Sequence, residues 1–176
     1  HTIDNLYIKR HVQNSNSSKL GLFGHIAGSS SDHSVIENLT LNNVNITGYA
    51  MVGGLAYRTQ YAELKNITVK GDITGTEWTV GGIVAQLENT SVVEVRSLAN
   101  ITGQSEVGGL FATSLVSNIA RSYSTGTLTA TSTGDQTIGG LAGYAADTTF
   151  TDSYSTANII APTVIGTSYY VAMGGL

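Results

Sequence analysis

The sequence predicts an all-β protein, a parallel β-solenoid (β-helix) with about one coil per 27–35-residue repeat. The first observation is a recurring block in which two glycines stand between apolar residues. It reads Val52-Gly53-Gly54-Leu55 and returns at Val80–Ile83, Val107–Leu110, Ile138–Leu141 and Met173–Leu176, after a degenerate copy at Leu20–Gly24. From Leu55 onward the copies lie 28, 27, 31 and 35 residues apart. A recurrence of this length indicates a repeat array.

The second observation is a block that follows each glycine pair and supplies the strands. Apolar residues alternate in it, as at Leu39 and Leu41 and then at Val44 and Ile46. This is the period of a half-buried strand. Copies span residues 36–48, 64–75, 92–103, 119–130 and 150–161, and a partial copy spans residues 3–8. No pattern with a period of 3.6 residues lasts three turns, so helix is not expected.

The glycine pairs are interpreted as corners of the coil. On a flat strand the valine and leucine that flank each pair, three positions apart, would face opposite sides. If both are buried, the chain must bend between them, and glycine permits both the bend and a close backbone approach. Stacked coils would then form one buried column from Val52, Val80, Val107 and Ile138, and another from Leu55, Ile83, Leu110 and Leu141.

A third position of the strand block is expected to form a ladder. Asn5, Asn38 and Asn66 would stack as amides at a turn, and Glu94, Arg121 and Asp152 would continue the column with charged residues. The last two copies place serine at positions that hold leucine or valine elsewhere, namely Ser122, Ser124, Ser153 and Ser155. These coils are therefore expected to be thinner or more polar inside.

The repeated Val-Gly-Gly-Leu, followed by Ile-x-Asn-x-x-x-x-Gly-x-Ile-x-Gly, resembles the GLUG repeat of bacterial surface and secreted proteins. Such repeats occur in adhesin-like proteins and in the non-catalytic parts of metallopeptidases that cut immunoglobulin A. The resemblance covers nearly the whole chain. It implies an extracellular or cell-surface location. Because the immunoglobulin A peptidases carry their zinc motif outside the repeats, the resemblance gives this segment no peptidase activity.

Composition excludes several classes of function. The 176 residues carry a net charge of −4 and only 11% charged residues, which gives no basic face for nucleic acid. No run of about 18 apolar residues is present to span a membrane. Cysteine is absent, so stability must come from stacked strands rather than disulfides.

Residues 1–176 are expected to form one solenoid segment of a longer protein. The chain opens inside one repeat and ends inside another, and solenoids need polar caps. Neighbouring repeats or copies of the same chain are the expected partners, with a host protein or glycan as a further possibility. Loops of variable length between the strands are the places where binding can evolve.

Candidate residues for chemistry occur singly. His11, His25 and His33 lack a His-Glu-x-x-His pattern, so no metal site or cofactor is expected. Clustered carboxylates would indicate a carbohydrate-active β-helix. Glu77 and Glu106, each shortly before a glycine pair, are the best match to that pattern.

The outer surface offers two sets of candidates. Tyr49, Trp78 and Tyr170 precede glycine pairs and are a candidate contact strip for sugar or protein. Asn-x-Ser/Thr triplets begin at Asn16, Asn38, Asn45, Asn66, Asn89 and Asn100. If the amide ladder forms, Asn38 and Asn66 become poor acceptors. Asn16, Asn45, Asn89 and Asn100 are then the better candidates for glycosylation.

The sequence therefore favours a non-catalytic structural or interaction module of a large extracellular or cell-surface protein, as a stalk, adhesin or fibre segment. The first alternative is a carbohydrate-active or carbohydrate-binding β-helix. The second is an ice-binding solenoid. That would need a regular Thr-x-Thr ladder, which only residues 127–131 resemble.

Overall fold

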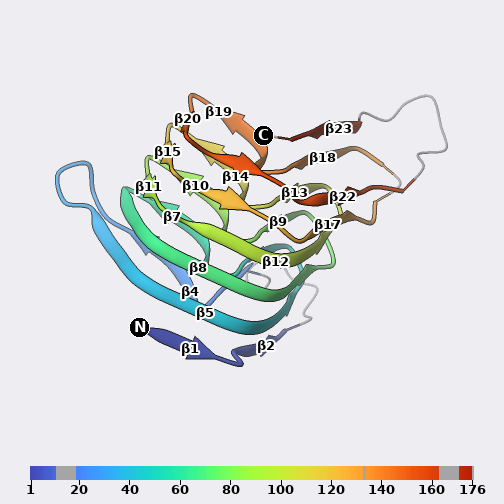
Figure 1. The fold of residues 1–176 in the computed structure, drawn as a ribbon, viewed down its shortest axis with the longest axis horizontal. Coiled ribbons are helices and arrows are strands. Elements are labelled where there is room, and N and C mark those ends of the chain that lie inside the picture. The colour runs from blue at the N-terminus through green and yellow to red at the C-terminus, as the bar shows by residue number, and fades with distance from the viewer. Residues whose placement is uncertain (11–18, 133, 163–170, 176) are drawn as a thin grey trace.

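The computed structural model describes residues 1–10, 19–132, 134–162 and 171–175, and it confirms the β-solenoid. The described residues form strands and no helix, and the chain makes about five turns. Figure 1 shows the coils stacked from the blue N-terminal end to the red C-terminal end. Three parallel sheets run along the stack, and we name them A, B and C. Among the described residues no helix is long and apolar enough to cross a bilayer.

Sheet A is the largest and contains 12 strands. Its strands are β1 (Thr2–Asp4), β2 (Tyr7–Lys9), β5 (Ser34–Gly48), β8 (Ala62–Gly75), β11 (Ser91–Val93), β12 (Arg96–Gly103), β15 (Asn118–Ala120), β16 (Tyr123–Ser124), β17 (Thr127–Ala130), β20 (Thr149–Thr151), β21 (Tyr154–Ser155) and β22 (Asn158–Ile160). These segments coincide with the predicted strand blocks. The long strands β5 and β8 give way to two or three shorter strands in the later coils.

Sheets B and C lie on either side of the glycine pairs. Sheet B contains β3 (Lys19–Leu20), β6 (Met51–Gly53), β9 (Thr79–Gly81), β13 (Glu106–Gly108), β18 (Gln136–Gly139) and β23 (Val171–Gly174). Sheet C contains β4 (Phe23–Ala27), β7 (Ala56–Gln60), β10 (Val84–Glu88), β14 (Phe111–Leu115) and β19 (Ala142–Ala146). Each coil therefore passes through sheets A, B and C in that order.

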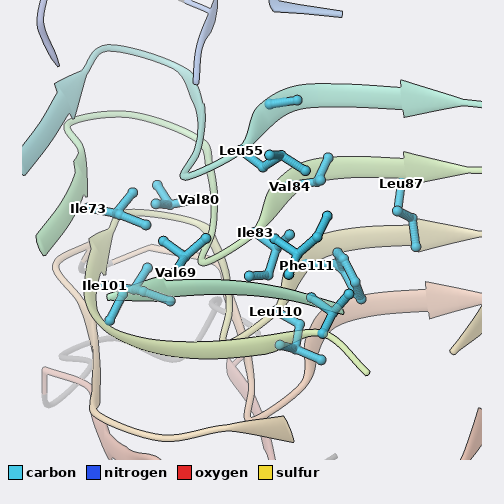
Figure 2. Packing of buried hydrophobic residues seen from close by; sticks show 14 of the residues in the cluster. Leu55, Val69, Ile73, Val80, Ile83, Val84, Leu87, Ile101, Leu110 and Phe111 are labelled. Carbon is cyan, nitrogen blue, oxygen red and sulfur yellow. The ribbon is translucent and has the colours of Figure 1, made fainter. Parts of the chain in front are cut away.

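Both predicted apolar columns are confirmed. Val80 pairs in register with Val52 and with Val107, and Val107 pairs with Ile138. In the second column, the backbone N–H groups of Leu55, Ile83 and Leu110 each donate to the next member of the column, at 2.8–2.9 Å. All eight side chains are at most 1% exposed. Figure 2 shows Leu55, Ile83 and Leu110 following one another down the stack.

The glycine pair is a corner without room for a side chain. A Cβ added to Gly81 would meet the Val84 carbonyl and would lie 2.9 Å from the Ala112 nitrogen. A Cβ on Gly82 would lie closer than 3.0 Å to the Gly109 carbonyl of the next coil and to the Ser97 hydroxyl of sheet A. Neither glycine needs a positive φ. Close approach of backbones, rather than an unusual conformation, therefore explains this pair.

The predicted polar interior of the later coils is confirmed by a serine column in sheet A. Ser97 pairs in register with Ser124, and Ser124 pairs with Ser155. The Ser124 hydroxyl donates to the Gly140 carbonyl and contacts the Ser155 hydroxyl at 2.8 Å. The Ser97 hydroxyl is equally buried but has no partner among the described residues. Two serines of one column therefore differ in hydrogen bonding.

Replacing Gly81 by valine is expected to destabilise the protein by about 3 kcal/mol or more, because the new Cβ overlaps backbone that cannot rotate away. Thermal and denaturant melts measure the loss. Gly24→Ala is the control, because its Cβ would meet only the Tyr57 ring, at 3.9 Å. An unchanged melt for Gly81→Val would refute the crowding.

Replacing Ser97 by alanine is expected to raise the free energy of unfolding by about 1 kcal/mol, since it removes a buried hydroxyl without a partner. Ser124→Ala is the matched variant. It removes the same atom from the same column but breaks two hydrogen bonds. It should cost about 1 kcal/mol or more. Denaturant melts that shift both variants in the same direction would contradict this difference.

Candidate functional site

Two candidate glycosylation sites lie on the outer face of sheet A. Asn45 and Asn100 are exposed and stand in register on either side of Asp72. The Asn100 amide donates to Asp72 Oδ1 at 3.0 Å. Both asparagines therefore project from the middle of strands, over a polar surface.

Asn89 occupies a different position, at the corner between sheets C and A. It is half-buried, lies between β10 and β11, and has a φ of 46°. Asn16 lies outside the described residues. Glycosylation of these four asparagines stays a prediction.

The amide ladder is confirmed for two of its three asparagines. The Asn66 amide donates to Asn38 Oδ1 at 2.8 Å, and both residues have positive φ values near 50°. Asn5 was predicted in the same column, and this was wrong. It accepts instead from the Asn43 amide at 2.7 Å, because β1 pairs with residues 40–42 in the middle of β5 and so places Asn5 beside Asn43.

Charged residues continue this column as predicted. Glu94, Arg121 and Asp152 follow in register, and all three have positive φ values. Arg121 Nε lies 3.1 Å from Glu94 Oε1, with both side chains about half exposed. Such a pair contributes no more than about 1 kcal/mol. The column marks a bend in sheet A rather than a cluster of reactive groups.

The candidate aromatic strip is divided between loops of unequal length. Gly48 pairs with Gly75 and Met51 with Thr79. The loop between Gly75 and Thr79 is therefore one residue longer than the loop between Gly48 and Met51. Trp78 lies in that longer loop and is 63% exposed, whereas Tyr49 is half-buried. Tyr170 lies outside the described residues. A contact role for this strip stays a prediction.

A different pair of aromatic residues does stack. The rings of Tyr123 and Tyr154 lie 5.2 Å apart and are nearly parallel, on the outer face of sheet A. Sequence reasoning missed this pair, although each tyrosine sits in an identical Ser-Tyr-Ser-Thr run. The stack runs along the solenoid axis, so its ring faces cover each other.

The two candidate carboxylates do not share a register position. Thr79, and not Glu77, pairs with Glu106. Glu106 Oε2 accepts a hydrogen bond from the Thr113 hydroxyl at 2.6 Å, across the glycine corner. A pair of carboxylates acting on one glycosidic bond needs both groups directed at the same point. The register does not supply that arrangement here.

The described histidines lie apart from each other on the N-terminal coils. His25 stands beside Tyr57, and burial, followed by the nearby Arg58 guanidinium, lowers the pKa of His25. His33 Nδ1 lies 3.8 Å from Glu63 Oε1. A hydrogen bond from Lys65 lowers the pKa of Glu63. Within the described ranges, no three His, Cys, Asp or Glu residues are placed to hold a metal ion.

A column of threonines runs along sheet A. Its four members stand in register and close the strand block in successive coils: Thr47, Thr74, Thr102 and Thr129. The neighbouring outer column holds Asn45, Asp72, Asn100 and Thr127. A Thr-x-Thr pair therefore occurs in one coil of these four. In the other three coils the first threonine of the pair is replaced by Asn45, Asp72 or Asn100, so the surface is polar but has no regular ladder of hydroxyls.

Besides the column of Asn38 and Asn66, a second corner has left-handed backbone, and it was not predicted from the sequence. Between sheets C and A, one residue per coil has a φ between 46° and 50°: Tyr61, Asn89, Val116 and Asp147. Asparagine and aspartate are common in this conformation, but a β-branched valine is an outlier. Because the four residue types differ, no repeated letter marks the position in the sequence.

Comparison with known proteins places these observations in a family context. Residues 134–160 match the family model described as the GLUG motif, which confirms the resemblance. Over 99 residues, or 56% of the chain, the sequence is 38% identical to Halomucin of Haloquadratum walsbyi. The matched part spans 1% of the length of that relative.

Replacing Val116 by asparagine is expected to raise the free energy of unfolding by about 1 kcal/mol, because asparagine tolerates a φ of 49° better than valine. The side chain is 53% exposed, so little buried contact is lost. Denaturant melts provide the measurement. Leu115→Asn is the adjacent control and should give no gain. A Val116→Asn protein less stable than the parent would show that valine makes contacts that outweigh the strain.

Proposed function

We propose that this chain is a non-catalytic structural and interaction module, a stalk, adhesin or fibre segment of a large protein at the cell surface or outside the cell. The observation that carries the proposal is the parallel pairing of strands from coil to coil in three sheets along the stack. Strands paired in this way from coil to coil make a quasi-one-dimensional body whose length grows with repeat number. Such a body suits the spacing or presentation of other domains.

The distribution of recurrent residues supports the same role. The residues that recur in each coil from Val52 onward are the glycine pairs and the buried columns, as at Gly53, Val52 and Leu55. The candidate catalytic carboxylates do not recur from coil to coil, and Glu77 and Glu106 stand at different register positions. An active site needs several groups directed at one reacting centre. The residues that recur are therefore those that maintain the fold, and not those that an active site would need.

The surface location is supported by the comparisons. The GLUG match and the identity to Halomucin both relate the chain to repeat regions of surface proteins. Since 99 matched residues are 1% of that relative, we propose that this segment also works within a longer protein. Labelling of intact producing cells with a membrane-impermeant reagent tests the location, and an inaccessible segment would contradict it.

Deleting one whole coil, residues 56–83, is expected to leave a folded but shorter solenoid. Val84 pairs with Ala56, so the junction brings β10 onto β4 in the register that β7 held. The chain has no cysteine. Spin labels can therefore be attached at Val35→Cys and Thr149→Cys, exposed positions of one column four coil intervals apart. Their separation should fall from about 19 Å to about 14 Å, measured by EPR.

Removal of residues 56–69, about half a coil, is the matched control. It joins β6 of sheet B directly to the second half of β8 in sheet A, where a strand of sheet C should follow, and it should abolish the cooperative melt. If the 28-residue deletion also unfolds the chain, or leaves the label distance unchanged, the coil is not an independent spacing unit. The spacer function would then lose its structural basis.

A further inference from the structure

A pocket of about 200 Å³ lies on the outer corner between sheets C and A. At this corner β7, β10 and β14 lead into β8, β11 and β15 (Figure 1). Four successive coils contribute to its lining. The lining residues are Ser30, His33, Tyr61, Asn89, Thr90, Val116 and Asn118. None of the residues singled out as a carbohydrate-active or aromatic contact site belongs to it. Asn89 is the one candidate glycosylation site on its rim.

The backbone around the pocket is already paired. Tyr61 N donates to the Glu88 carbonyl, Asn89 N to the Leu115 carbonyl and Val116 N to the Ala146 carbonyl, at 3.0–3.3 Å. A peptide that binds by adding a strand needs free backbone groups at a sheet edge. This corner offers none at those positions. Recognition must therefore come from side chains.

The side chains select an uncharged, hydroxyl-rich ligand. No Lys, Arg, Asp or Glu lines the pocket. Among the described contacts, the side-chain amides of Asn89 and Asn118 make no hydrogen bond, so each can both donate and accept. The Tyr61 ring lies 6.3 Å from the His33 ring and supplies an amphipathic aromatic surface. Amides beside an aromatic ring match the hydroxyls and C–H face of a sugar.

Size and backbone conformation agree with this choice. The volume is below the roughly 300–1,000 Å³ of pockets for drug-sized ligands, so a single ring is the largest ligand enclosed. Tyr61 and Val116 line the pocket from left-handed backbone, at φ values of 49°. Strained residues that persist at a concave surface suggest function rather than folding.

We propose that this corner pocket binds one pyranose ring of a neutral glycan. The ring has two possible sources with the same chemistry. It belongs either to a soluble or neighbouring glycan, or to a glycan attached to Asn89 itself, which begins an Asn-Thr-Ser triplet. The binding function is independent of the spacer function, because a rod without glycan affinity still meets the latter.

The first experiment uses the protein made in a host without N-glycosylation. It is titrated with methyl glycosides of glucose, galactose, mannose and N-acetylglucosamine and followed by saturation-transfer NMR. A ring of about a dozen heavy atoms is expected to bind with a Kd near 1 mM. Tyr61→Asn should weaken binding at least tenfold without lowering the Tm, because asparagine suits the left-handed corner. Tyr144→Asn, an exposed tyrosine outside the pocket, is the control and should bind normally.

The second experiment uses protein from a glycosylating host, with Ser91→Ala as the matched variant. That change removes the acceptor triplet and keeps Asn89. If the attached glycan is the ligand, mass spectrometry locates it on Asn89, and nuclear Overhauser effects connect it to the Tyr61 ring. Soluble glycosides then bind only the Ser91→Ala protein.

Either Tyr61-dependent glycoside binding or an attached glycan in contact with Tyr61 supports the proposal and identifies the source. Two results overturn it. One is binding that Tyr61→Asn leaves unchanged. The other is the absence of both signals, that is, no saturation transfer from any glycoside and no attached sugar near Tyr61. Neither result affects the label distances that test the spacer function.

Discussion

The rest of the structure depends on the close approach of the glycine corner to its neighbours. The second glycine of each pair stands against the glycine carbonyl of the next coil, as Gly82 does against Gly109, and against the inner face of sheet A. Any side chain there would push adjacent coils apart or force sheet A outward. Because the spacing between parallel strands is fixed at about 4.8 Å, adjacent coils cannot move apart to make room for a side chain. A strict requirement for glycine follows at one point of every coil.

The same constraint limits the size of the sheet A side chain that faces each glycine corner. In the second coil the facing residue is Val69, and an added Cβ on Gly54 would lie 2.8 Å from Val69 Cγ1. In the next coils the facing residues are Ser97 and Ser124, beside Gly82 and Gly109. An added Cβ would lie closer to these serine side chains than to Val69, and serine at this position buries a hydroxyl. The serine ladder recovers part of the cost of that burial through hydrogen bonds between coils, such as Ser124 to Ser155.

The left-handed corners show how much the stack tolerates. Each such residue costs about 1–3 kcal/mol when it is not glycine or asparagine. One coil carries Tyr61 and Asn66 in this conformation, and only the first of them is an unfavourable residue type. The same coil buries six large apolar side chains completely, from Leu64 to Ile83, and each burial contributes about 1.5–3 kcal/mol. Packing therefore exceeds strain several-fold, which leaves the outer corner free to carry tyrosine or valine.

This balance explains which features the sequence reveals. Buried columns and glycine corners recur as letters, because every coil meets the same packing constraint, and they were predicted residue by residue. Asn5 was misplaced because an irregularity in β5 between Leu41 and Val44 provides a second asparagine turn at Asn43. The pocket at Tyr61 was not predictable from a motif, since its lining residues come from four coils and no one residue type recurs in all of them. A solenoid restricts its inside to a few residues and leaves its outside unrestricted, so a binding site on it can be found only by stacking the coils in register.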